Sequence, residues 1–284
     1  MKSLLWFNPE NDLALAVGDR PYTPPRAAIA LRRAGALLPS LWADESDIIL
    51  TEVPTPVDPT LHPQPWGWSS FTRSVLLRCG IAEENLPSAD RISRMRQLSH
   101  RRSASRLLSI IGHPDSLIPI EATSSSQAMN AIERFGGKAF IKLPWSCSGR
   151  GVIDSGTIPT QRLSEIIKGM ISRQGSVMVE PRYNRLRDFA ALFHCSRGHV
   201  TFRGLSLFST DSTGRYSGNI VAPQNRIEAA IGADISPLIP GLENALEQIY
   251  ADDYEGWLGI DMLLHSDSDG HRHIAPCIEI NMRM

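Results

Sequence analysis

The chain is poor in cysteine, has no long apolar run and carries no excess of charge of either sign. Its 284 residues include only 4 cysteines, and 29 Lys and Arg residues balance 30 Asp and Glu residues to a formal net charge of −1. This balance gives no reason to expect a nucleic-acid or membrane-surface partner. The cysteines form no CxxC pair, which argues against a zinc site and a disulfide framework. They stand at Cys79, Cys147, Cys195 and Cys277.

A targeting or membrane-spanning segment is not evident either. The first residues, MKSLLWFNPEND, contain no long apolar stretch and reach an acid at Glu10, so we expect neither a signal peptide nor a transmembrane helix. The cytoplasm is the expected location. Because 42% of the residues are hydrophobic, we expect a globular protein of one large domain or two to three smaller ones.

The first third of the chain alternates strand and helix patterns. SLLWF (3–7) and DIILTEV (47–53) are short apolar runs typical of buried strands. TPPRAAIALRRAGALL (23–38) and SSFTRSVLLRCG (69–80) show helical spacing with suitable start and stop residues. This order predicts a parallel α/β layer. The proline-rich run 54–65 is interpreted as a surface connection.

The rest of the chain predicts two α+β lobes. It opens on a basic helical region at 91–112, and the later pattern includes a hairpin that turns at Arg197-Gly198 and two final strands within 256–284. We therefore expect three domains, at residues 1–94, 95–180 and 181–284.

A loop rich in serine and glycine follows a predicted strand in AFIKLPWSCSGRGV. Glycine lets backbone N–H groups approach an anion, and serine adds hydroxyl donors. The strand ends in Lys142, and the candidate loop ligands are Ser146, Ser148 and Gly149. Together they suit a polyphosphate, although the spacing is not that of a Walker loop. A glycine-rich hairpin turn beside a surface lysine fits the same residues.

The strand VMVEPR ends in a single acid, Glu180, before a proline. An adenine ring needs an apolar slot and one or two hydrogen bonds, and a carboxylate beyond the slot can accept from a ribose hydroxyl. Asp188 stands near the start of the next predicted strand. A solvated acid at a strand end also explains Glu180 taken alone.

Oxygen-bearing side chains fall on the last two predicted strands. GIDMLL places Asp261 among apolar residues, and CIEINMRM alternates so that Glu279, Asn281 and Arg283 share one face. Acids inside apolar runs are unusual unless something positive meets them. Two carboxylates and an amide, with no His or Cys beside them, suit a hard cation such as Mg²⁺. Acids that face water on an exposed sheet fit the same pattern.

These three clusters, in this order, resemble the ATP-grasp superfamily over roughly residues 95–284. IEINMR is similar to the acid-x-Asn-x-Arg strand of biotin carboxylase and carbamoyl phosphate synthetase, and the motifs also resemble those of D-alanine–D-alanine ligase. IKLPWSCSGRGV resembles the family's Lys-Pro strand and phosphate-covering loop, and VEPRYNRLRDF resembles its adenine hinge. The resemblance implies a mixed α/β and α+β chain, with an ATP-grasp fold behind an N-terminal parallel α/β domain.

The resemblance also implies a role for each candidate residue. The family usually has an earlier lysine at the entry to the middle lobe, where LSHRRSASRLL offers arginines instead, and we expect Arg101 or Arg102 to supply that charge. The implied ligands are ATP and one or two Mg²⁺ ions, with Mn²⁺ as an allowed substitute. By position, Lys142 contacts phosphate and adenine. The adenine is lined by Met178, Val179 and Glu180, and the ribose meets Asp188. The metal is held by Asp261, Glu279 and Asn281, and Arg283 faces the reacting centre.

The implied reaction is phosphorylation of a substrate carboxylate, followed by attack of an amine on the acyl phosphate. Arg283, with Arg203 as a second candidate, would stabilise the carboxylate or the oxyanion, although a surface role fits Arg203 equally well. A kinase-like phosphotransferase and a non-catalytic ATP-binding module are the alternatives. The expected partners are small-molecule carboxylates and amines, and a homodimer is allowed.

Two weaker signals lie in the first third. Asn8, Glu10, Asn11 and Asp12 of NPEND follow the first strand, where ligands of open α/β sheets bind, and they suit an amine-bearing substrate. A simple turn explains them as well. WGWSS (66–70) leads into a helix whose N-terminus suits a carboxylate, or is simply capped.

Overall fold

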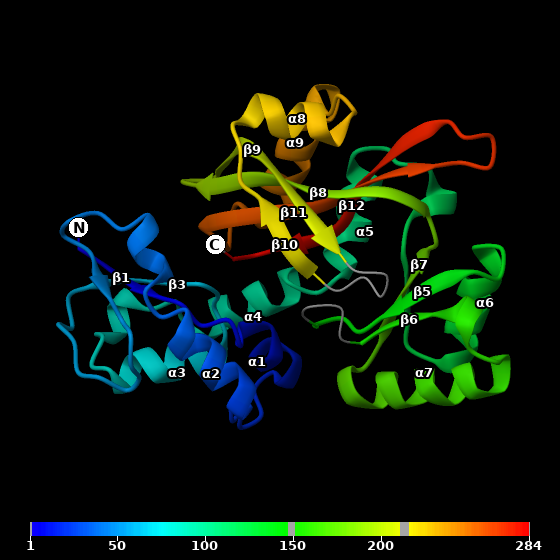
Figure 1. The fold of residues 1–284 in the computed structure, drawn as a ribbon. Helices are drawn as coiled ribbons and strands as arrows, with labels where there is room; N and C mark the ends of the chain where they lie inside the picture. The colour runs from blue at the N-terminus through cyan, green and yellow to red at the C-terminus, as the bar shows by residue number, and fades with distance from the viewer. Residues whose placement is uncertain (1, 147–150, 211–215, 284) are drawn as a thin grey trace. The chain divides into compact units, whose positions relative to one another are not determined.

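The computed structural model describes residues 2–146, 151–210 and 216–283, and it divides into two compact units (Figure 1). The N-terminal unit comprises the residues up to Leu98 together with Arg283, and the second unit comprises Ser99–Met282. The boundary expected at residue 94 falls inside helix α4 (Ala89–Leu98). The boundary expected at residue 180 stays a prediction.

The N-terminal unit is built on a three-stranded parallel sheet with the order β2-β1-β3. Its elements are β1 (Ser3–Trp6), α1 (Asn11–Val17), α2 (Arg26–Ala34), β2 (Ile48–Ile49), β3 (His62–Pro65), α3 (Ser70–Arg78) and α4. Leu4 and Trp6 of β1 are buried in one hydrophobic core with Val75 and Leu76 of α3. The parallel α/β layer expected from the alternating pattern is therefore confirmed.

Strand β3 lies inside the proline-rich run that the sequence suggested was a surface connection, and that interpretation is wrong for residues 62–65. The hydrogen bonds explain how a strand tolerates these prolines. His62 and Trp66 donate their N–H groups to the carbonyls of Lys2 and Trp6 at 3.0 and 2.7 Å, so alternate N–H groups face β1. Pro63 and Pro65 occupy the positions between, where an N–H group would point away from β1 at the sheet edge.

The basic region predicted as one helix forms two, α4 and α5 (Arg102–Ile110). Residues 99–101 separate the two helices. His100 then starts α5, since its Nδ1 accepts the Arg102 N–H at 3.0 Å and its carbonyl accepts the Ser103 N–H at 2.9 Å. Arg101 thereby becomes the N-cap residue of α5.

The second unit contains a four-stranded sheet with the order β4-β7-β5-β6. Its elements are β4 (Ile120–Ala122), α6 (Ser125–Arg134), β5 (Ala139–Lys142), β6 (Val152–Asp154), α7 (Thr160–Gln174) and β7 (Val177–Pro181). One face of the sheet packs against α6 and α7, where Ile141 and Val179 meet Ile132 and Ile167. The residues that alternate with these on β5 and β7 lie on the other face of the sheet.

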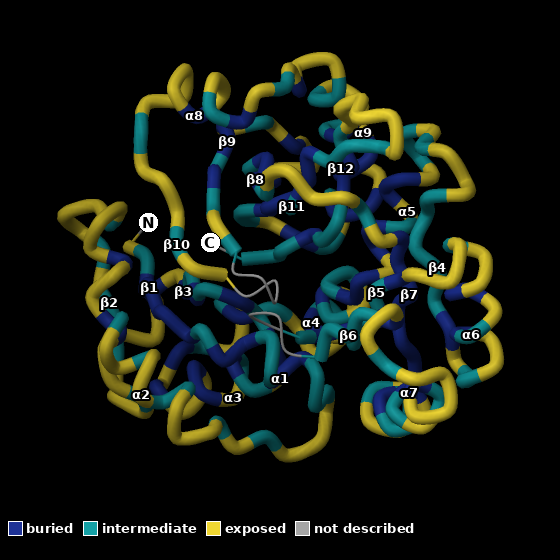
Figure 2. The backbone as a smooth tube through the Cα atoms, turned by 45° about the vertical axis from the view of Figure 1, so that its right-hand side comes forward, coloured by how far each residue is buried: buried dark blue, intermediate teal, exposed yellow. Residues whose placement is uncertain are grey.

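The same unit contains a five-stranded sheet with the order β10-β9-β8-β11-β12 and only antiparallel pairings. Its elements are β8 (Asn184–Ser196), β9 (His199–Thr210), β10 (Tyr216–Ile220), α8 (Gln224–Ile231), α9 (Ile239–Tyr250), β11 (Gly256–Ser266) and β12 (Arg272–Asn281). The predicted turn is confirmed, because Arg197 and Gly198 join β8 to β9 with φ values of 52° and 81°. Every residue of β11 is buried or intermediate, whereas β8 begins with an exposed stretch and is buried mainly from Phe189 to Cys195 (Figure 2).

Candidate functional site

The three predicted metal ligands share one face of the five-stranded sheet. Asp261 of β11 lies directly opposite Glu279 of β12, and Gly259 lies opposite Asn281, whose Nδ2 donates to Asp261 Oδ2 at 3.2 Å. Ile260 and Ile280, which alternate with them, are buried on the opposite face. The carboxylates are only partly buried. The structure thus brings together two carboxylates and an amide, which is an oxygen-rich donor set that fits a hard divalent cation.

Arg101 joins this group from the start of α5. Its Nη1 lies 2.7 Å from Glu279 Oε2, while its Nε donates to the Leu143 carbonyl at 3.1 Å and its Nη2 to Ser146 Oγ at 3.2 Å. Only 7% of the Arg101 side chain is exposed. One buried guanidinium therefore links a predicted metal ligand to the start of the predicted phosphate loop.

The electrostatic surroundings keep Arg101 charged. Burial disfavours its charged form, but the carboxylates of Glu279, Glu180 and Asp261 outweigh this and raise its pKa above the ordinary value of arginine. Arg102 is placed differently, since its side chain is 46% exposed and its Nη1 lies 3.6 Å from Glu121. Of the two arginines expected to replace the family's entry lysine, the structure puts Arg101 among the site carboxylates.

Lys142 and Glu180 form the second ion pair of the site. The Nζ and Oε2 atoms lie 2.5 Å apart, with 12% and 7% of the respective side chains exposed. The register of β5 and β7 sets Lys142 opposite Met178 and Phe140 opposite Glu180, so these side chains share the sheet face that α6 and α7 leave open. The predicted phosphate and adenine residues Lys142, Met178 and Glu180 are thus neighbours.

The role of Val179 in lining the adenine stays a prediction. Its side chain is fully buried in the hydrophobic core between the four-stranded sheet and helices α6 and α7. This burial follows from the alternation of side chains along a strand. Val179 is on the same face of the sheet as Val177 and Ile141, whereas Met178 and Glu180 are on the other face.

The remaining candidate residues are Asp188, Arg203, Ser148 and Gly149. Asp188 is on the same face of the five-stranded sheet as Asp261 by register, and its Oδ2 accepts from Thr210 Oγ1 at 2.6 Å and Arg185 Nη1 at 3.3 Å. Arg203 is exposed at a bulge in β9, between the pairs Leu192–Gly204 and Phe193–Phe202. Ser148 and Gly149 lie outside the described residues.

Cys277 is a buried thiol next to the site that the sequence patterns did not indicate. Burial, together with the carboxylates of Asp261, Glu180 and Glu279, raises the pKa of the Cys277 thiol well above its usual value. The thiol is therefore protonated at neutral pH, and Cys277 is not a nucleophile in this state.

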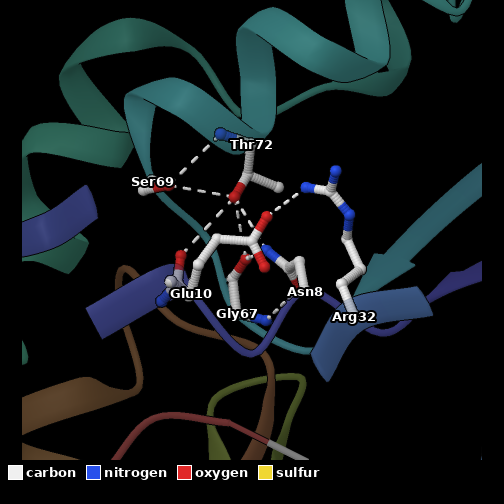
Figure 3. A network of polar contacts seen from close by, with 7 residues as sticks. Asn8, Glu10, Arg32, Gly67, Ser69 and Thr72 are labelled. Atoms are coloured by element: carbon white, nitrogen blue, oxygen red, sulfur yellow. Dashed lines mark hydrogen bonds and ion pairs between the residues drawn. The ribbon is translucent and has the colours of Figure 1, made fainter. Parts of the chain in front are cut away.

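In the N-terminal unit, the NPEND turn is tied to the start of α3 by a buried polar network (Figure 3). Asn8 Nδ2 donates to the Gly67 carbonyl and to Thr72 Oγ1, both at 2.9 Å, and Asn8 Oδ1 accepts the Gly67 N–H at 3.1 Å. Ser69 caps α3 by accepting the Thr72 N–H at 3.2 Å, which confirms the capping alternative. Gly67 is required, since a Cβ there would lie 2.4 Å from Asn11 Nδ2.

The buried members of NPEND are held by contacts within the N-terminal unit. Asn8, Glu10 and Asn11 are at most 3% exposed, and Glu10 is ion-paired with Arg32 of α2. Asp12 is the exception. Its Oδ2 lies 2.7 Å from Nη1 of Arg283, and 17% and 30% of the two side chains are exposed. The sequence patterns did not indicate that these two residues meet.

Replacement of Asn8 by alanine is expected to destabilise the N-terminal unit. The change removes three hydrogen bonds and leaves the N–H of Gly67 buried without its partner, which costs about 2–4 kcal/mol of unfolding free energy. Urea denaturation followed by tryptophan fluorescence measures this loss. Asn85→Ala is the matched control, because Asn85 makes one exposed bond to the Pro59 carbonyl. Equal losses for the two variants would contradict the role of the network.

Several solved structures are similar in fold to this chain. No family model and no curated protein matches the sequence. The structure is similar to D-alanyl-alanine synthetase A from Vibrio cholerae, at 12% identity and a TM-score of 0.57 over 99% of this chain and 88% of that one. It is also similar to N5-carboxyaminoimidazole synthetase from Staphylococcus aureus complexed with ADP, at 14% identity and a TM-score of 0.55 over 100% and 72%.

A third similar structure is the biotin carboxylase domain dimer of 2-oxoglutarate carboxylase from Hydrogenobacter thermophilus, in complex with MgADP, ADP and bicarbonate. Its identity is 14% and its TM-score 0.54, over 100% of this chain and 64% of that one. These likenesses, with the two sheets described above, show that the chain has the ATP-grasp fold. Among the described helices, none has the length and apolar character needed to cross a membrane.

Proposed function

We propose that this protein is an ATP-dependent ligase that activates a substrate carboxylate as an acyl phosphate and joins it to an amine, releasing ADP and phosphate. The observation that carries the proposal is the placement of Asp261, Glu279 and Asn281 on one sheet face with the guanidinium of Arg101 against Glu279. The named similar structures support it, because two of them are synthetases and two hold ADP.

The charges of the site suit a metal–nucleotide complex. Three carboxylates, those of Asp261, Glu279 and Glu180, face two cations, those of Arg101 and Lys142. Mg²⁺, held by Asp261, Glu279 and Asn281 together with phosphate oxygens, would neutralise the charge that develops during phosphoryl transfer. Arg101 and Lys142 would then bind phosphate oxygens, since both cations are already held in the site.

The remaining residues would orient the substrates. Met178 and Glu180 would line the adenine, and Asp188 would accept from a ribose hydroxyl with Thr210 fixing its orientation. Arg283, two residues beyond Asn281, would bind the carboxylate that is phosphorylated and the oxyanion that follows. No side-chain nucleophile is required, because the amine attacks the acyl phosphate directly and phosphate leaves.

The test is an incubation of the protein with ATP, Mg²⁺ and pooled small carboxylates and amines, followed by phosphate release and mass spectrometry. We expect ADP, phosphate and an amide adduct whose formation requires one acid and one amine. A phosphorylated product without an adduct would replace the proposal with the kinase alternative. ATP binding without turnover in every pool would replace it with the non-catalytic module. Sedimentation of the active protein tests whether it is a homodimer.

A further inference from the structure

The turn that carries Asp12 is firmly held. Asn8 is bonded to Gly67 and Thr72, and Glu10 is ion-paired with Arg32 of α2, so neighbouring elements hold the turn from two directions (Figure 3). Helix α1 begins at Asn11, which places Asp12 in the first turn of that helix. The Asp12 carboxylate therefore projects from a rigid base.

Arg283 is the ion-pair partner of Asp12. A free arginine side chain samples many rotamers, and their restriction costs about 2 kcal/mol. The carboxylate of Asp12, 2.7 Å from Nη1 of Arg283, meets part of that cost before any substrate binds. Arg283 follows Asn281 by two residues, and two residues of extended chain span about 7 Å at most, so its backbone stays near that of a predicted metal ligand.

The contribution of the pair to folding stability is small. Exposed and partly exposed ion pairs contribute little to folding, typically about 0–1 kcal/mol. The Asp12–Arg283 pair is partly exposed on both sides. A stabilising role alone would not account for a carboxylate on a rigid turn that meets the arginine of the acid-x-Asn-x-Arg motif.

We propose that Asp12 is a positioning residue, which holds the Arg283 guanidinium in the orientation needed to bind the reacting carboxylate. This inference rests on the proposed ligase function and extends it to a residue outside the motifs that resemble the ATP-grasp family. Asp12 itself does not touch the reacting atoms. It acts through Arg283, so its removal affects the chemical step and not nucleotide binding.

The experiment is a double-mutant cycle of Asp12→Asn and Arg283→Ala in the full chain, with Asp19→Asn as the matched control. Asp19 is an exposed carboxylate of the same unit, whose Oδ1 accepts from Ser70 Oγ at 3.2 Å. We expect Asp12→Asn to lower kcat roughly 10- to 100-fold while leaving the KM for ATP within about twofold of the original value. The double variant should be no slower than Arg283→Ala alone, and Asp19→Asn should match the unmodified protein.

Additive losses in the cycle, or equal activity of Asp12→Asn and Asp19→Asn, would overturn the positioning role. A direct measurement of the pair separates this outcome from failure of the proposed function. In protein with ¹⁵N-labelled arginine, the Nε–Hε resonance of Arg283, assigned with Arg283→Lys, should shift in Asp12→Asn and not in Asp19→Asn. An unmoved resonance would refute the pairing whatever the enzyme does. If the unmodified protein turns over no substrate pool, the ligase function and the positioning role both fall, and a shifted resonance would show that the pair exists without them.

Discussion

Replacement of Glu279 by glutamine is expected to abolish turnover and to leave the protein folded. Glutamine keeps the shape and one oxygen acceptor for Arg101, so the expected loss of folding free energy is only about 1 kcal/mol. The charge that would bind Mg²⁺ is lost, however, and with it several kcal/mol of transition-state stabilisation. A loss of about 4 kcal/mol corresponds to roughly a thousandfold fall in rate.

The measurement is steady-state phosphate release with the acid and amine found in the pooled assay, together with thermal unfolding of the same samples. Glu133→Gln, an exposed change on α6 in the same unit, is the control and should retain full activity. Full activity of Glu279→Gln at saturating Mg²⁺ would remove Glu279 from the metal site.

Replacement of Arg101 by methionine is expected to weaken both the fold and nucleotide binding. Methionine fills much of the space but removes a buried cation, so Glu279 loses its counter-charge at a cost of about 3 kcal/mol. The affinity for ATP should fall about 10- to 100-fold, which is the effect of losing one or two charge-assisted hydrogen bonds. Arg102→Met should change both quantities little, because Arg102 is exposed and faces Glu121 instead.

The effect of Mg²⁺ on the unfolding temperature distinguishes this prediction from simple destabilisation. The carboxylates freed by Arg101→Met attract a divalent cation more strongly than the paired carboxylates do, so Mg²⁺ should raise the unfolding temperature of the variant more than that of the unmodified protein. The comparison is made by calorimetry with MgCl₂ and with NaCl of the same ionic strength. An equal Mg²⁺ effect on both proteins would contradict the competition between Arg101 and the ion.

The final strand shows how far the sequence could predict the site. Alternation within CIEINMRM placed Glu279 and Asn281 on one face, and the antiparallel register brings Asp261 beside them, as expected. The side chain of Val179 faces the helix layer, which a continuous apolar run such as VMV does not reveal. The choice between Arg101 and Arg102 depends on the helix break at His100, which charge pattern alone does not indicate.

The contact between Asp12 and Arg283 could not be predicted from the sequence. Asp12 and Arg283 are 271 residues apart, and only the folded chain brings them within 2.7 Å. The strand in the proline-rich run was missed for a different reason. Proline is depleted in strands, and only the position of the strand at a sheet edge makes it acceptable there.

The edge position of β3 in the N-terminal sheet also affects how the protein can associate with other chains. Another strand can extend a sheet only where N–H and carbonyl groups are available in alternation. Pro63 and Pro65 remove the outward N–H donors of β3, so recruitment of a neighbouring strand is blocked on that side of the N-terminal sheet. The opposite edge, β2, pairs over only Ile48 and Ile49, which offers an incoming strand a very short template. At high concentration, the N-terminal sheet should therefore resist strand-by-strand aggregation.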